Sequence, residues 1–186
     1  GFRKLLDAVR TAIGTKKLSE LQSHSPRNHD DVNHTILSNK DGRYAWRPFE
    51  LIHPALYVSL VGFMTEKANW KMIVERFGVF AENVKIRCLS LPVASTSVEK
   101  DKAEQVSRWW QNVEQRSIEL SLDYEYVIET DITDCYGAIY THSIAWALHS
   151  KPVAKQCRRG ATLIGNIIDN HIQGMRHGQT NGIPQG

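Results

Sequence analysis

One stretch of the chain governs how the rest is interpreted, and it reads Tyr126-Val127-Ile128-Glu129-Thr130-Asp131-Ile132-Thr133-Asp134-Cys135-Tyr136. Aromatic and β-branched residues dominate its first half, which predicts a buried strand over residues 124–132. The strand runs directly into Asp131, and a second acid, Asp134, follows three residues later. Because burying an unpaired carboxylate is costly, we expect Asp131 to have a partner.

A divalent cation is one partner that suits Asp131, since Mg²⁺ prefers a few carboxylates together with phosphate oxygens. Other interpretations of these acids are open at this point. Either residue could cap the helix that follows, and Asp134 lies closer to that helix. The pair could also hydrolyse phosphate esters, or act as acid and base on the two sides of a glycosidic bond.

Helical periodicity dominates the sequence on both sides of this stretch. It predicts helices over residues 2–21, 99–120, 139–149 and 153–175, and two more between residues 49 and 77. A polar segment at residues 22–42 predicts a long loop, and the alternation that begins at Val84 predicts a second strand over residues 84–91. Because helices and strands mix without strict alternation, we expect the α+β fold class.

Several side chains indicate where these helices begin and which faces they bury. Pro54 suits the first turn of a helix, and His53 suits a hydrogen bond at the same helix start. Thr65 is expected to cap the next helix, and Gly78 is expected to end it. The residues expected to face the core are Trp70, Ile73, Val74 and Phe77, then Val106, Trp109, Trp110, Val113 and Leu120, and finally Leu163, Ile164, Ile167, Ile168 and Ile172.

The composition limits the classes of protein and of partner. The 186 residues give room for one domain or one and a part, and 41% apolar with 23% charged residues argues against disorder. A net charge of +3 permits a nucleic-acid partner without requiring one. Three scattered cysteines without a CxxC pair argue against structural zinc and favour the cytoplasm. The longest apolar run, Leu56–Met64, is shorter than the roughly 20 residues that span a bilayer, so we expect no membrane contact.

A second informative segment lies at residues 178–186 and holds three glycines and a proline. Glycines let a backbone approach a ligand closely, so this composition predicts a shaped loop. Within it, the side-chain amide of Gln185 could read the edge of a sugar or a base. Taken alone, the segment fits a plain tight turn equally well.

Taken together, these two segments resemble the reverse transcriptase family. Residues 131–136 look like the first catalytic motif of its palm, and residues 182–186 look like the start of the second, the loop that supports template and incoming nucleotide. The runs at residues 139–149 and 47–54 are similar to those of bacterial abortive-infection and antiphage-defence reverse transcriptases. The resemblance covers residues 46–186, and it implies helix-rich fingers followed by the start of a polymerase palm.

The resemblance implies a role for each residue of these motifs. Asp131 would be a carboxylate ligand of both catalytic Mg²⁺ ions, and the backbone carbonyl of Ile132 would complete the coordination of the nucleotide-bound ion. Tyr136 falls where the family keeps an aromatic steric gate, which favours dNTP over NTP. Gln185 would contact the incoming nucleotide, and Asp134 would contact its triphosphate region through the backbone or a water molecule.

The family also presents basic residues to the triphosphate from a β-hairpin of the fingers. Lys85 and Arg87 are the best candidates for this role, because alternate positions on a predicted strand share one face. Arg47 is the next candidate. A solvated strand face is the other interpretation of the Lys85 and Arg87 pair.

The resemblance divides the chain into an N-terminal helix and polar loop (residues 1–45), a fingers-like region (46–123) and an early palm (124–186). The third palm motif, with its paired aspartates, is expected beyond Gly186, so this piece alone is expected to incorporate little dNTP. The whole protein is expected to be a cytoplasmic RNA-directed DNA polymerase of bacterial antiviral defence. Its expected partners are dNTPs, Mg²⁺, an RNA template or non-coding RNA, the DNA product and further copies of itself. The alternative is a non-catalytic RNA-binding or oligomeric scaffold built on the same fold.

Overall fold

The computed structural model describes residues 1–14, 16, 20, 24–39, 42–88, 102–159 and 162–185. These residues divide into two compact units, one formed by residues 1–73 with 133–186 and the other by residues 74–132. The regular secondary structure of the described residues consists of helices and a two-stranded antiparallel sheet, which confirms the predicted α+β class. None of the described helices has both the length and the apolar character needed to cross a membrane.

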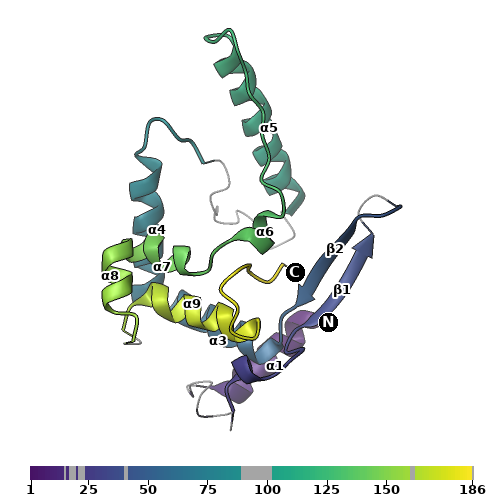
Figure 1. Cartoon of the computed structure of the whole chain (residues 1–186), viewed down its shortest axis with the longest axis vertical. Helices are drawn as coiled ribbons and strands as arrows, with labels where there is room; N and C mark the ends of the chain where they lie inside the picture. Colours follow the sequence, from purple (N-terminus) through teal and green to yellow (C-terminus); the bar gives the residue numbers. More distant parts are fainter. Residues whose placement is uncertain are drawn as a thin grey trace. The chain divides into compact units, whose positions relative to one another are not determined.

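The first unit holds most of the helices (Figure 1). They are α1 (Phe2–Ile13), the short 3-10 helix η1 (Pro26–Asn28), α3 (Pro54–Thr65), α6 (Cys135–Ala138), α7 (His142–His149), α8 (Lys151–Gln156) and α9 (Ile164–Met175). Helix α4 (Lys67–Ala81) begins in the first unit and continues into the second, which also contains α5 (Lys102–Ser121). The single helix predicted over residues 153–175 is therefore two helices, α8 and α9, with a break between them.

The core of the first unit is built on α9, which packs against α3 and α7 (Figure 1). Ile168 and Ile172 of α9 are buried with Ile73 of α4. The predicted apolar stripe of α9 is thus confirmed, since Leu163, Ile164 and Ile167 are half-buried beside them. Gly165 lets α9 approach α7 closely, because a Cβ atom there would lie 2.7 Å from the Cα of Ala145. The helix with the regular apolar spacing, α9, therefore supplies the buried core of this unit.

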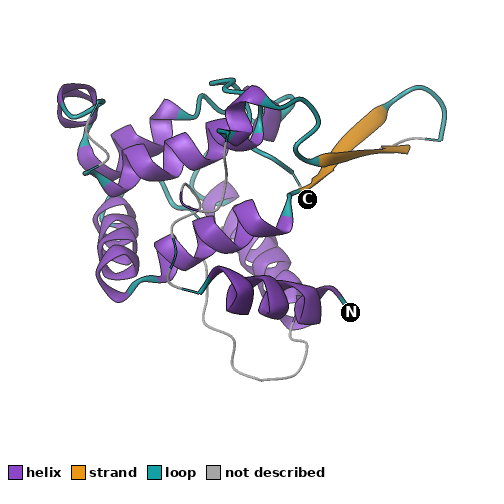
Figure 2. Ribbon diagram, turned by 90° about the horizontal axis from the view of Figure 1, so that it is seen from below, coloured by secondary structure: helices purple, strands orange, loops and turns teal. Residues whose placement is uncertain are grey.

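A hairpin of two strands, β1 (His34–Asn39) and β2 (Trp46–Leu51), projects from the helices of the first unit (Figure 2). Its register pairs His34 with Leu51 and Asn39 with Trp46. The loop predicted over residues 22–42 is wrong where β1 lies, and the helical pattern predicted from Phe49 begins only at Pro54. The strands are mostly exposed, and β1 groups its apolar residues side by side, so their sequence carries little of the alternation by which a half-buried strand is recognised.

The predicted helix ends are partly confirmed. Pro54 occupies the first turn of α3, and Nδ1 of His53 accepts a hydrogen bond from the Ala55 N–H at 3.3 Å. Thr65 does not cap α4; it is the last residue of α3, where its hydroxyl donates to the Val61 carbonyl at 2.8 Å. Helix α4 also runs past Gly78 to Ala81. A helix-interior glycine costs only about 1 kcal/mol, which neighbouring good helix formers can offset.

Both strands predicted for the second unit are wrong. No strand occurs in the described residues 84–88 or 124–132, and residues 89–91 lie outside the described part of the chain. The side chains meant for a buried sheet face are open to solvent, with Val84 98% and Ile128 90% exposed. A strand is stable only when a neighbour takes its backbone hydrogen bonds, and the described residues of this unit hold no such neighbour.

The amphipathic helix predicted over residues 99–120 is confirmed as α5, whose described part begins at Lys102. Its expected core face is exposed, however, including Trp109 and Trp110, whose rings make an edge contact with each other. On α4, Ile73 is buried as predicted, whereas Trp70, Val74 and Phe77 are exposed. Apolar periodicity therefore predicted these helices correctly but not the burial of their faces.

His171 makes the stability of the first unit sensitive to acid. Its ring stacks on Phe63 at 6.4 Å between centroids, and burial lowers the pKa of His171 from the ordinary value of 6.5. The unfolded chain therefore binds a proton that the folded chain excludes. The free energy of unfolding is expected to be unaffected above pH 6.5 and to fall as the pH drops below it.

Urea titrations at about pH 5.5 and about pH 7.5 measure this difference. A His171→Phe variant is expected to lose part of the acid sensitivity, whereas His34→Gln, at an exposed position on β1, is expected to keep all of it. An unchanged pH difference in His171→Phe would contradict the assignment.

Candidate functional site

Two motifs far apart in the sequence are held together by backbone hydrogen bonds in the first unit. The Ile183 N–H donates to the Tyr136 carbonyl at 2.9 Å, and the Gly182 N–H donates to the Ile139 carbonyl at 2.7 Å. An isolated β-bridge between Tyr140 and Asn181 continues this pairing. The segment of the first predicted motif that follows Asp134 therefore lies directly beside the glycine-rich loop.

Gly182 is required where this loop passes α6. Its φ of +83° lies in the left-handed region that favours glycine, and a Cβ atom there would lie 3.0 Å from the Gly137 carbonyl oxygen. The next residue, Ile183, packs against the core around Ile168 and Ile172. The backbone conformation of Gly182 and the apolar anchor of Ile183 together fix the path of the chain towards Gln185.

Strand β2 holds the other end of the loop. The Glu50 N–H donates to the Gln185 carbonyl at 2.7 Å, so the C-terminal segment lies beside β2 (Figure 1). The Glu50 carboxylate also pairs with Arg176 at 2.9 Å, and the Arg176 guanidinium donates to the Ile183 carbonyl at 3.4 Å. This ion pair is largely buried, with 17% of the Glu50 side chain and 23% of the Arg176 side chain exposed.

Asn33 completes this arrangement from the residue before β1. Its side-chain amide donates to Glu50 at 3.2 Å and to the Met175 carbonyl at 3.0 Å, and its side-chain oxygen accepts from the His53 N–H at 3.0 Å. Sequence reasoning missed the roles of Asn33, Glu50 and Arg176. A signal for one of them was present, because Glu50 lies between Phe49 and Leu51 in the run at residues 47–54, and an acid among apolar residues calls for a partner.

Four of the residues predicted to contact a nucleotide belong to the first unit, on or beside the segments just described. Tyr136 lies on α6 with 47% of its surface exposed, Gln185 is half-buried beside β2, and Arg47 is exposed on β2. Asp134 immediately precedes α6 in the left-handed conformation, with φ of 49°. Its side chain makes no capping hydrogen bond and lies beside Gly137.

The other predicted residues belong to the second unit. Asp131 is exposed, and one of its carboxylate oxygens accepts the Ile132 N–H at 2.8 Å. The expectation of a buried acid that needs a counter-charge is therefore wrong, because water solvates this carboxylate. Its chemistry still suits magnesium, since the carboxylate and the Ile132 carbonyl are oxygen ligands of the kind that Mg²⁺ prefers. Across the described ranges, no three His, Cys, Asp or Glu side chains form a group that could hold a metal.

Lys85 and Arg87 are exposed but do not share a strand face as predicted. Lys85 lies in the turn that follows α4, where its N–H donates to the Asn83 side chain at 3.0 Å. The β-hairpin that the structure does contain is β1–β2, and among the predicted basic residues it carries Arg47. Of the three basic residues predicted for this role, Arg47 lies on a hairpin, whereas the described segment that holds Lys85 and Arg87 forms no strand.

A buried polar network lies on the other elements of this unit, between α7 and α9. Asp169 accepts from His142 Nδ1 at 2.5 Å and from the Gln173 amide at 2.7 Å. The Gln173 side-chain oxygen in turn accepts from the Arg27 guanidinium at 2.6 Å, and its amide lies 3.3 Å from the hydroxyl of Thr141, which is fully buried. Because an ionised carboxylate only accepts hydrogen bonds, His142 Nδ1 is the donor in its contact with Asp169.

No family model matches the sequence, and a search of curated proteins gives no significant match. The function is therefore inferred from the motifs and from the contacts among them. Those contacts give a fixed loop ending in Gln185, a half-exposed tyrosine ring at Tyr136 and an exposed cation at Arg47. A tyrosine ring can stack on a base or a sugar, and a guanidinium can bind an anion.

Proposed function

We propose that the chain is the fingers and early palm of a defence-associated reverse transcriptase, which polymerises DNA from dNTPs. The observation that carries this proposal is the set of backbone hydrogen bonds joining the Tyr136 segment, the loop from Gly182 to Gln185, and β2. These are three of the runs that resemble the family, and they are distant in sequence. Their contact supports a shared role at one nucleotide site.

Asp131 and Ile132 would hold magnesium through the carboxylate and the backbone carbonyl. Bound Mg²⁺ supplies charge stabilisation to the attacking 3′-oxygen and to the leaving oxygen of an in-line displacement at the α-phosphate. Tyr136 would pack its ring against C2′ of the incoming sugar and exclude a 2′-hydroxyl. Gln185 would contact the nucleotide, and the exposed guanidinium of Arg47 would meet the triphosphate.

The partners that follow from this proposal are dNTPs, an RNA template or non-coding RNA, and the DNA product. The cytoplasm of a bacterium under phage attack is the proposed setting, and assembly into homo-oligomers is part of the proposal. The rival proposal is a non-catalytic protein with the same fold, which serves as an RNA-binding or assembly scaffold. A phosphohydrolase that uses Asp131 and Asp134 is a weaker rival.

Tyr136→Ala tests the proposed sugar gate. In the whole protein, the variant is expected to lose about tenfold or more of the preference for dNTP over NTP, because nothing then blocks the 2′-hydroxyl. Primer-extension or self-primed assays with matched dNTP and NTP concentrations measure the ratio. Tyr124→Ala, which removes an exposed tyrosine from the second unit, is the matched control and is expected to leave the ratio unchanged.

An unaltered ratio in Tyr136→Ala would remove Tyr136 from the nucleotide site. Phosphate release without chain growth would favour the phosphohydrolase. Phage protection by a protein that binds RNA and incorporates no nucleotide would favour the scaffold.

A further inference from the structure

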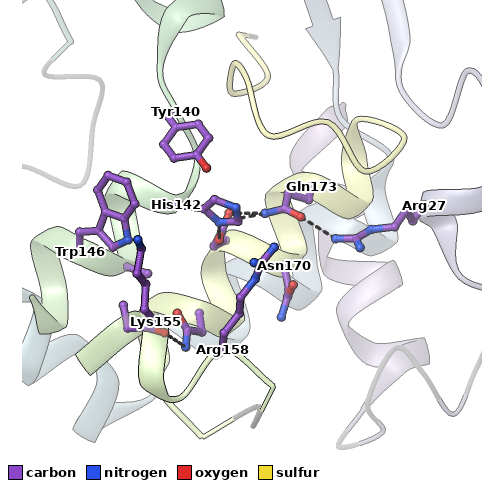
Figure 3. Close-up of a pocket in the computed structure, with 12 residues that line it drawn as sticks. Arg27, Tyr140, His142, Trp146, Lys155, Arg158, Asn170 and Gln173 are labelled. Atoms are coloured by element: carbon purple, nitrogen blue, oxygen red, sulfur yellow. Dashed lines mark hydrogen bonds and ion pairs between the residues drawn. The ribbon is translucent and has the colours of Figure 1, made fainter. Parts of the chain in front are cut away.

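A cavity of about 350 Å³ opens between α7, α8 and α9, at residues that the proposed polymerase site does not use (Figure 3). Three cations line it: Arg27 from η1, Lys155 from α8, and Arg158 from the turn that follows α8. Two aromatic side chains, Tyr140 and Trp146, line another part of it. The volume falls within the range of pockets that hold small organic ligands.

The positive charge of this cavity is largely uncompensated. Its three cations outnumber its one acid, Asp169, which accepts hydrogen bonds from His142 and Gln173. Arg27 donates to the neutral amide of Gln173, which leaves its charge in place. Within the described part of the chain, the Lys155 and Arg158 side chains form no ion pair, and both residues are exposed. An anion entering the cavity would therefore meet free cationic donors.

The aromatic part of the cavity has the geometry of a partly open stacking surface. The rings of Tyr140 and Trp146 lie 5.5 Å apart between centroids at an interplanar angle of 60°. Tyr140 is held from the other side by an edge contact with His142, and it keeps 41% of its surface exposed. The Lys151 ammonium, which does not line the cavity, lies over the Trp146 ring at 4.6 Å from its centroid. Because neighbours hold both rings, a planar ligand could stack on them without first ordering them.

We propose that this cavity binds a nucleotide, with its phosphate held by Lys155 and Arg158 and its base against Tyr140 and Trp146. Planar stacking with cationic phosphate contacts is the combination by which proteins hold nucleotides of any sequence. The exposed Asn170 side chain at the rim offers both a donor and an acceptor for a base edge. Neither Tyr136 nor Gln185 lines the cavity. The cavity is therefore separate from the proposed polymerase site, and its proposed ligand goes beyond the polymerase proposal.

The same chemistry could be supplied by a free nucleotide or by one nucleotide of a single strand. Calorimetric titration of the 186-residue chain with adenosine 5′-monophosphate is the primary test. Lys155→Ala and Arg158→Ala are each expected to weaken binding about tenfold. Arg159→Ala, a neighbouring exposed cation that does not line the cavity, is the matched control and is expected to change binding by less than about twofold. Ribose 5-phosphate, which lacks the base, is expected to bind about tenfold more weakly.

A double variant, Tyr136→Ala with Gln185→Ala, separates this site from the proposed polymerase site. It is expected to bind adenosine monophosphate as the parent chain does; loss of binding there would overturn the proposal. Equal weakening by Arg158→Ala and Arg159→Ala, or no binding of either the mononucleotide or a short oligoadenylate, would overturn it as well. Tighter binding of the oligoadenylate, sensitive to Arg158→Ala, assigns the site to a polynucleotide, and tighter binding of the mononucleotide assigns it to a free nucleotide.

Discussion

An Asp131→Asn variant of the whole protein is expected to lose about a hundredfold or more of its dNTP incorporation. The substitution keeps the shape of the side chain and removes the negative charge that would hold magnesium. Because Asp131 is exposed and hydrogen-bonded only to its neighbour Ile132 among the described residues, its loss is not expected to disturb folding. The measurement is incorporation of labelled dNTP across a range of Mg²⁺ concentrations.

Glu129→Gln is the matched control, since Glu129 is another exposed acid in the same extended segment. It is expected to keep full activity. Equal losses in the two variants would mean that general charge in this segment matters and that no specific ligand exists. Full incorporation by Asp131→Asn would remove Asp131 from the magnesium site, and phage protection that persists in Asp131→Asn without incorporation would favour the non-catalytic scaffold.

Asp169→Ala is expected to have the largest effect on stability, lowering the free energy of unfolding by about 3 kcal/mol. The Asp169 side chain is only 7% exposed and accepts hydrogen bonds from both His142 and Gln173. Its removal leaves the His142 and Gln173 donors without the acceptor that orients them. The Gln173 amide then no longer has a fixed position, and Arg27 loses a well-oriented acceptor.

Urea denaturation monitored by circular dichroism measures this loss. Asn170→Ala, at the adjacent exposed position, is the control and is expected to change stability by less than about 0.5 kcal/mol. Asp169→Asn is expected to lie between the two, because its amide oxygen can serve only one of the donors. Similar stability for Asp169→Ala and Asn170→Ala would mean that the network contributes nothing to the fold.

The parts of the fold that could be predicted are those whose information is local. The apolar spacing of Ile164, Ile168 and Ile172 predicts both a helix and its buried face, and α9 confirms this. The capping role of His53 likewise depends on neighbours within two residues. Strands depend on a partner that the local sequence does not specify, which explains both the strands wrongly predicted in the second unit and the missed hairpin.

The candidate site likewise contains contacts that the sequence predicted and contacts that it did not. The motif pattern predicted that the stretch around Tyr136 and the loop around Gln185 belong together, and their hydrogen bonds agree with that expectation. The ion pair that fixes the loop, Glu50 with Arg176, joins residues 126 positions apart, and no spacing rule connects them. The burial assumed for Asp131 was wrong because it rested on a predicted strand that finds no partner among the described residues.

The hydrogen bond between the Glu50 N–H and the Gln185 carbonyl has a mechanical consequence. Arg47 and Glu50 both belong to β2, so the Arg47 guanidinium and the N–H group that holds the loop are carried by the same short strand. A displacement of β2 that keeps this hydrogen bond would therefore also move the main chain at Gln185.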